Sequence, residues 1–178
     1  MAEKTIKMLV EEHKNILRVA EAMETECDKI ASGMKGVDEA FFKKAIQFIR
    51  DYADKYHHAK EENILFKELC SEEAKGKMHC NPVEQMLLEH DEGRKLVLGI
   101  EEGMKEKDKM KVVENAMGYV SLIREHIFKE DNILYPMAEQ ALSKESQNAM
   151  LKKFLTEDKK LGKEKENSLG ILKEFGKR

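Results

Sequence analysis

The sequence predicts an all-α protein, an up-down-up-down four-helix bundle with an additional C-terminal helical segment. The composition is rich in Glu, Lys, Leu, Met and Ala, with only two prolines in 178 residues, and such usage favours helices over strands. Apolar residues recur three and four positions apart in four long segments, which is the spacing of one face of a helix. Short connections between these segments are typical of neighbouring antiparallel helices.

The first two predicted helices begin and end at recognisable signals. Thr5 is expected to cap the first helix, which runs to about Ser32 and ends before Gly33, because Thr favours N-caps and Gly favours C-termini. Asp38 is expected to cap the second helix, which ends near Cys70.

The third and fourth predicted helices follow a connection over residues 71–81. Asn81 and Pro82 form a start signal for the third helix, a cap followed by proline at the first helical position. A charged turn over 105–109 separates it from the fourth helix, which ends near Leu142.

The chain is expected to divide into two parts. Residues 1–142 would form the four-helix bundle, and residues 143–178 would form a C-terminal helical extension packed on or beside it. Ser143 is expected to cap the first helix of the extension, and Gly162 to separate it from a second.

The bulk properties exclude several classes of protein. A net charge of −3 with both signs interspersed predicts neither a nucleic-acid partner nor a membrane surface. No apolar run approaches the about 20 residues of a membrane span, and the start lacks the apolar core of a secretory signal. Cys27, Cys70 and Cys80 are an odd number at unrelated spacings, which argues against a disulfide framework. We expect a cytoplasmic protein, with His79 and Cys80 in an ordinary loop.

A ten-residue stretch, 57–66, recurs without gaps at 126–135. Both copies hold His, Lys, Glu, Asn, Ile and Leu at the same places, and each contains His-x-x-x-Glu. On a helix this spacing puts an imidazole and a carboxylate one turn apart on the same face. The two pairs are His57 with Glu61 and His126 with Glu130.

These pairs, together with His13 and His90, fall on the apolar stripes that should face the core. Six buried ionisable groups without partners would cost several kcal/mol each. At about 1.5 Å per helical residue, an antiparallel bundle brings all six to one level. Four imidazoles and two carboxylates suit a pair of first-row transition metals. Iron fits best, with manganese as a possible exchange partner, because structural zinc needs only four ligands and calcium and magnesium prefer oxygen.

The order of these six residues, and the Asn-Ile-Leu-Phe or Asn-Ile-Leu-Tyr that follows each pair, resembles the hemerythrin-like (HHE cation-binding) family. The resemblance covers residues 1–142. It implies two iron ions in an oxo- or hydroxo-bridged non-haem di-iron centre, and dioxygen, peroxide or nitric oxide as the small ligand.

The chain departs from the oxygen-carrying members of that family. Arg94 stands where they have a further histidine, one turn after His90. Asp131 matches their aspartate, but we favour Glu130 because it keeps to the repeat and to the core stripe. His58 could supply the missing ligand, or could only hydrogen-bond to one. A missing ligand leaves an open iron position, which favours reactivity over reversible carriage.

Further residues near the repeat have open roles. Tyr56 is a more distant candidate for the missing ligand. Arg94 either neutralises a carboxylate or controls access to the iron. Lys60 and Lys129 are expected to be solvated, although their repetition indicates pairing with acidic residues.

The sequence leaves three functions open. The leading hypothesis is a non-haem di-iron protein that binds, senses or reacts with dioxygen or related small oxidants. The second is a di-iron enzyme that decomposes peroxide or reduces nitric oxide, and the third is iron sensing or storage. The sequence does not identify a redox partner.

Overall fold

The computed structural model describes residues 2–71, 74 and 81–176, and every regular element within them is helical. The all-α prediction is therefore confirmed for this part of the chain. None of the described helices combines the length and the apolarity that a membrane crossing requires. Most of the predicted connection over 71–81, with His79 and Cys80, lies outside the described residues.

The first half of the chain forms a long helix and then a composite helical run. Asp38 caps the run as predicted, because its Oδ1 accepts a hydrogen bond from the Phe41 amide at 3.0 Å. The run contains two stretches of wider, π-type turns, labelled η. The elements are α1 (Ala2–Ala31), α2 (Glu39–Phe48), η1 (Ile49–His58), η2 (Glu61–Leu65) and α3 (Phe66–Leu69).

The expectation that Thr5 caps the first helix is wrong. Thr5 lies inside α1 and is 1 % exposed. It lines a small cavity together with Ala138 and Met150, which come from the last part of the chain. Helices from that part pack beside the start of α1, so Thr5 itself faces protein rather than solvent, and the helix begins before it.

The second half repeats the pattern of the first half and then adds two helices. Asp108 and Ser143 accept hydrogen bonds from the amides of Lys111 and Ser146 at 3.0 and 3.2 Å, so Ser143 is a cap as predicted. The elements are α4 (Asn81–Glu106), α5 (Lys109–Lys129), η3 (Glu130–Leu134), α6 (Tyr135–Ala141), α7 (Lys144–Lys160) and α8 (Gly162–Phe175).

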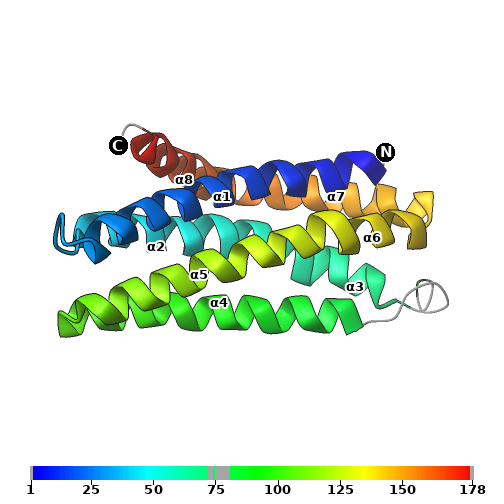
Figure 1. Cartoon of the computed structure of the whole chain (residues 1–178). Coiled ribbons are helices and arrows are strands. Elements are labelled where there is room, and N and C mark those ends of the chain that lie inside the picture. Colours follow the sequence, from blue (N-terminus) through cyan, green and yellow to red (C-terminus); the bar gives the residue numbers. More distant parts are fainter. Residues whose placement is uncertain (1, 72–73, 75–80, 177–178) are drawn as a thin grey trace.

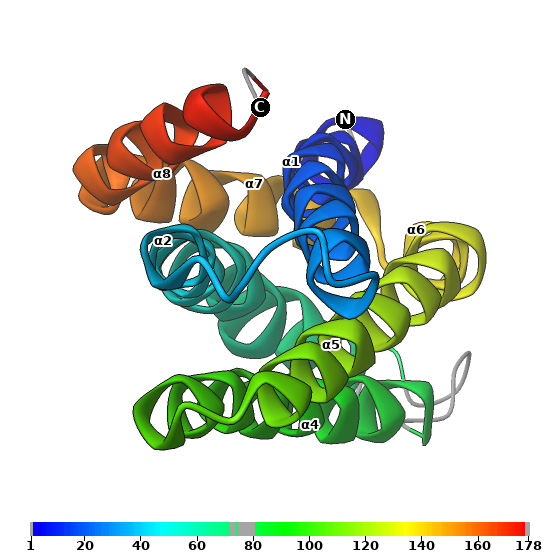
Figure 2. The same cartoon turned by 60° about the vertical axis from the view of Figure 1, so that its left-hand side comes forward.

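The long helices α1 and α4 and the α2–α3 and α5–α6 runs lie roughly along one direction and alternate in sense (Figure 1). α1 and α4 run one way, and the α2–α3 and α5–α6 runs return the other way (Figure 1). α5 packs along both α1 and α4, while α7 and α8 pack against α1 and the α2–α3 run. Figure 2 shows α7 and α8 on the side of α1 and α2 that faces away from α4.

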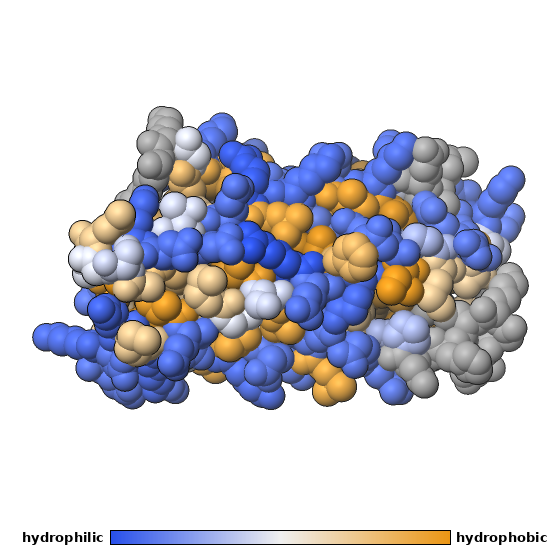
Figure 3. All heavy atoms as spheres, viewed as in Figure 1, coloured by the Kyte–Doolittle hydropathy of each residue, from blue (hydrophilic) through white to orange (hydrophobic). Residues whose placement is uncertain are grey.

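We call α1, the α2–α3 run, α4 and the α5–α6 run the four long helical runs. A polar layer interrupts the hydrophobic core where these runs meet. One apolar cluster holds residues such as Ile16, Tyr56 and Ile123, and the other holds residues such as Leu9 and Leu134. The histidines and glutamates of the repeat lie between these clusters along the chain. Outside, hydrophilic side chains cover most of the face in Figure 3, with apolar side chains between them along the middle.

The Asp38 cap gives a test of the fold. Asp38→Ala removes the acceptor for the Phe41 amide, and should lower the free energy of unfolding by about 1 kcal/mol, measured by urea denaturation. Asp28→Ala, an exposed change in α1, is the control and should alter it by less than about 0.5 kcal/mol. Equal effects of the two substitutions would contradict a specific capping role.

Candidate metal centre

The structure brings all seven predicted site residues into one buried layer, and none of them is more than 7 % exposed. Each of the four long helical runs contributes at least one of them. They are His13 from α1, His57, His58 and Glu61 from η1 and η2, His90 from α4, His126 from α5 and Glu130 from η3.

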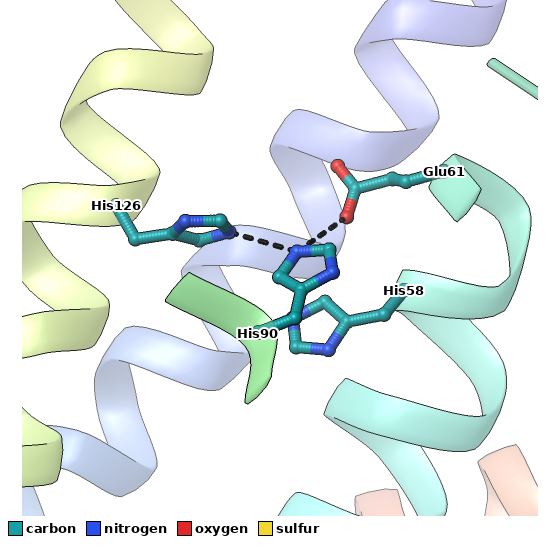
Figure 4. A group of neighbouring side chains, drawn as sticks. All are labelled: His58, Glu61, His90 and His126. Atoms are coloured by element: carbon teal, nitrogen blue, oxygen red, sulfur yellow. Dashed lines mark hydrogen bonds and ion pairs between the residues drawn. The ribbon is translucent and has the colours of Figure 1, made fainter. Parts of the chain in front are cut away.

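The seven residues form two groups that share Glu61, and in each group the possible ligand atoms all lie within 4.8 Å of one another. Figure 4 shows the group that contains His58, Glu61, His90 and His126. In it the Nε2 atoms of His90 and His126 face each other at 3.1 Å. The His13 half-site consists of His13, His57, Glu61 and Glu130, and the His90 half-site consists of His58, Glu61, His90 and His126.

Each central carboxylate lies between the two half-sites. The Oε2 atom of Glu130 is 3.2 Å from Nε2 of His13 and 3.3 Å from Nε2 of His126. The Oε2 atom of Glu61 is 3.6 Å from Nε2 of both His57 and His90. Each glutamate therefore meets one imidazole from either half, which is how a carboxylate that bridges two metal ions is placed.

A second set of carboxylates orients four of the imidazoles from outside. Each one lies within hydrogen-bond distance of an Nδ1 atom, so an Nδ1–H group can donate to it and the Nε2 atom faces the centre. The pairs are His13 with Asp131 (2.8 Å), His57 with Glu12 (2.9 Å), His90 with Glu62 (2.8 Å) and His126 with Glu89 (2.9 Å).

These outer carboxylates were not predicted as site residues, although the repeat contained a signal for them. Glu12 precedes His13 as Glu89 precedes His90, and Glu62 corresponds to Asp131 in the two copies. Each outer contact therefore occurs twice, related by the exchange of the two halves of the chain. Asp131 lies outside both half-sites and holds His13 instead.

The halves differ at His58, whose counterpart in the repeat is Ile127. The His58 ring stacks on His90 with ring centroids 3.8 Å apart. Its Nδ1 atom is 3.5 Å from Asp54, and neither ring nitrogen has a well-oriented hydrogen-bond partner among the described residues. The His90 half-site thus has a third imidazole that the His13 half-site lacks.

The halves also differ at Tyr135, whose counterpart is Phe66. The Tyr135 hydroxyl donates a hydrogen bond to Glu61 and lies 3.4 Å from Nε2 of His13. Phe66 only stacks on His90, with centroids 5.9 Å apart. Among the described residues, Tyr135 therefore gives Glu61 a hydroxyl donor that the corresponding position of the other copy, Phe66, does not offer.

Residues 4–138 match the family model of the hemerythrin HHE cation-binding domain. The chain belongs to this family. Comparison with curated proteins and with solved structures gave no match. The family description names cation binding, and the histidine and glutamate groups could hold metal ions in this hemerythrin-like domain.

The prediction that Lys60 is solvated is wrong, whereas the indicated pairing with acidic residues is confirmed. Lys60 is fully buried, and its Nζ atom lies 3.7 Å from the centroid of the Tyr56 ring and pairs with Glu12. Lys129 is 33 % exposed and pairs with Glu89. Lys60 is enclosed because α7 covers that side of the hemerythrin-like domain.

Tyr56 and Arg94, whose roles were open, both bind carboxylates. The Tyr56 hydroxyl donates to Asp158 at 2.7 Å, and Tyr56 belongs to neither half-site. The Arg94 guanidinium contacts Asp54 and Glu62 at 2.6 and 2.7 Å. Arg94 thereby neutralises the carboxylate that orients His90.

Burial and mutual repulsion determine the protonation of the layer. Burial lowers the pKa of His57 well below its usual value and that of His58 to about 3, so both imidazoles are neutral at pH 7. Burial and the neighbouring Glu130 raise the pKa of Glu61 well above its usual value. Burial also acts to raise the pKa of Glu130, but His126 and His13 outweigh it and lower that pKa to about 2. Of the two central carboxyl groups, Glu61 is therefore the one whose protonated form burial favours.

The unpaired atoms of the layer fit metal ions. Oε2 of Glu61, both carboxylate oxygens of Glu130 and both ring nitrogens of His58 are buried without a well-oriented hydrogen-bond partner among the described residues. Such atoms cost several kcal/mol unless a ligand satisfies them. Imidazole nitrogens mixed with carboxylate oxygens suit first-row transition metals.

The folded protein should therefore be more stable with metal bound than without it. Anaerobic addition of Fe²⁺ at 1,000 times its Kd should raise the free energy of unfolding by about 4 kcal/mol, measured by thermal denaturation. A chelator should reverse the gain, and Mg²⁺, which prefers oxygen ligands, should give a much smaller one. An unfolding temperature that Fe²⁺ leaves unchanged would rule out a metal centre in this layer.

Proposed function

We propose that this hemerythrin-like domain is a non-haem di-iron protein that binds, senses or reacts with dioxygen or related small oxidants. The observation that carries the proposal is the pair of half-sites joined by Glu61 and Glu130. Two groups of imidazoles with two shared carboxylates suit two ions better than one, because the bridging carboxylates balance the charge of both.

The proposal gives each central side chain a ligand role. His58 is included because both of its nitrogens lack a well-oriented partner among the described residues, whereas a residue that only supports a ligand would be hydrogen-bonded to it. His13 and His57 would hold one iron ion, His58, His90 and His126 would hold the other, and Glu61 and Glu130 would bridge them.

Iron is favoured by the donor set. Calcium and magnesium prefer all-oxygen sites, and neither half-site contains the cysteine that structural zinc usually recruits. Bound ferrous iron supplies the electrons that a small oxidant accepts.

The long helices support the proposed bundle. α1, the α2–α3 run, α4 and the α5–α6 run would be the four members of an up-down-up-down bundle, since they alternate in direction (Figure 1). Residues 1–142 would form this bundle, and residues 143–178 an extension beside it.

A cavity gives the oxidant a route to one half-site. Its volume is about 180 Å³, more than ten times the about 10–15 Å³ that one water molecule needs. Of the half-site residues, only His58, His90 and His126 line it. The small ligand would therefore meet the metal at the His90 half-site.

The walls of this cavity favour a second candidate function, the decomposition of peroxide or the reduction of nitric oxide. They are largely apolar, with Val97 and Ile123 among them. The hydroxyl of Tyr119, also in the wall, has no hydrogen-bond partner among the described residues. It could donate a hydrogen bond to an oxygen of an entering peroxide or nitric oxide molecule. Stopped-flow spectra of the reduced protein separate the candidates, since a reversible oxygen adduct supports binding and rapid turnover of peroxide or nitric oxide supports catalysis.

The metal content tests the ligand assignment. Iron-grown protein should contain about two irons per chain by the ligand count, and His57→Ala and His126→Ala should each lose most of this iron, measured by elemental analysis. Glu125→Ala, an exposed change beside His126, should retain it. Full retention of iron in both histidine variants would overturn the assignment.

The cavity has a separate test. Val97→Phe adds bulk to its wall, and should slow the reaction of the reduced protein with tert-butyl hydroperoxide at least about tenfold, because the peroxide must pass this wall to reach the metal (tenfold is about 1.4 kcal/mol of barrier). The iron content of the variant should not change. An unchanged rate with normal iron content would show that the oxidant reaches the metal by another route.

A further inference from the structure

A buried lysine connects the His13 half-site to the C-terminal helices. Lys60 is 0 % exposed, and its ammonium group pairs with Glu12 of α1 and with Asp158 of α7, the latter at 3.2 Å. Glu12 in turn accepts from Nδ1 of His57 at 2.9 Å. The chain of contacts thus runs from α7 to an imidazole of the candidate metal centre.

Asp158 has further support from the C-terminal part of the chain. The Tyr56 hydroxyl donates to its Oδ1 atom at 2.7 Å, and Lys165 of α8 donates to the Tyr56 hydroxyl at 2.7 Å. Asp158 and Lys165 lie beyond residues 4–138, the part of the chain that the family model covers. The contacts that lead to His57 therefore include residues outside the part of the chain that matches the family model.

The other half of the molecule provides an internal comparison. Lys129 pairs with Glu89, and Glu89 accepts from Nδ1 of His126, as Lys60, Glu12 and His57 do. Lys129 is 33 % exposed, however, and its described ion pair is with Glu89 alone. Gln85, a residue of α4, also donates to Glu89, at 2.6 Å. Solvent can supply the remaining hydrogen-bond acceptors of the Lys129 ammonium, whereas for the buried Lys60 ammonium the second carboxylate comes from α7.

The physical reason for a dependence on Asp158 is the burial of the Lys60 ammonium. This group carries three donors and no acceptor, and a buried charge left short of partners is strongly destabilising. The two oxygens of Glu12 are divided, because Oε1 faces Lys60 and Oε2 faces His57. Without the Asp158 carboxylate, Glu12 would be the one carboxylate left to Lys60 among its described ion pairs, and Glu12 would hold the His57 ring less well.

We propose that Asp158 is a positioning residue for the His13 half-site, acting through Lys60 and Glu12 on His57. The C-terminal extension then affects the metal affinity of the His13 half-site and leaves that of the His90 half-site unchanged. The inference rests on the proposed function, because it assumes that both half-sites bind metal.

Calorimetric titration of metal-free protein with Co²⁺, a spectroscopic substitute for iron, tests the proposal. Asp158→Asn should weaken one of two binding events about tenfold or more, the lower end of the effect of losing a partner of a metal-binding histidine, and should leave the other event unchanged. Glu157→Gln is the matched control, since Glu157 is the neighbouring α7 carboxylate and pairs with Lys160. It should change neither event.

A second readout concerns the metal-free protein alone. In ¹⁵N NMR spectra, Asp158→Asn should shift the imidazole resonances of His57 and leave those of His126 in place. If wild-type protein binds no Co²⁺ while this shift occurs, the proposed function fails and the positioning role stands. If wild-type protein binds two ions, equal weakening of both events, or of neither, overturns the inference. Should Asp158→Asn lack the wild-type circular dichroism spectrum, Asp158→Ser is measured by the same criteria.

Discussion

The interior of this protein depends on the neutralisation of one buried polar layer. Glu61 and Glu130 lie at its centre, and both are fully buried. Imidazoles from every long helical run contact these two carboxyl groups, so the layer fixes the depth at which the four runs meet. Above and below it the packing is apolar. The helices can slide along one another only by separating carboxylates from imidazoles, which would leave buried charges unpaired.

The repeat predicted the centre of the layer because residues four apart on a helix share a face, whatever the neighbouring helix does. It did not predict the outer carboxylates. Glu12 and His13 are adjacent, so their side chains point in different directions from α1, and each finds its partner on another helix. Sequence spacing describes one helix at a time, whereas these contacts depend on how two helices are rotated against each other.

The burial of Lys60 was missed for a related reason. Its counterpart Lys129 is partly exposed, and the two lysines have the same place in the repeat, so nothing local distinguishes them. The difference comes from α7, which follows far along the chain and covers one side only. The caps at Asp38 and Ser143 were predicted correctly because a cap is a contact over three residues. The Thr5 prediction was wrong because packing with distant residues extended the helix.

The π-type turns give the centre a dependence on chain length as well as on residue type. The amides of Phe66 and Tyr135 bond to the carbonyls of Glu61 and Glu130, five residues back instead of four. Each turn thus contains one residue more than an α-helix would use. Over the five steps from Glu130 to Tyr135 an α-helix would turn by about 500°, at about 100° per residue, whereas the wider turn covers a smaller angle. The widening therefore sets the direction in which Tyr135 leaves the helix relative to Glu130. The number of residues in each of these turns, and not their types alone, thus sets how the Glu61 and Glu130 carboxylates are directed relative to Phe66 and Tyr135.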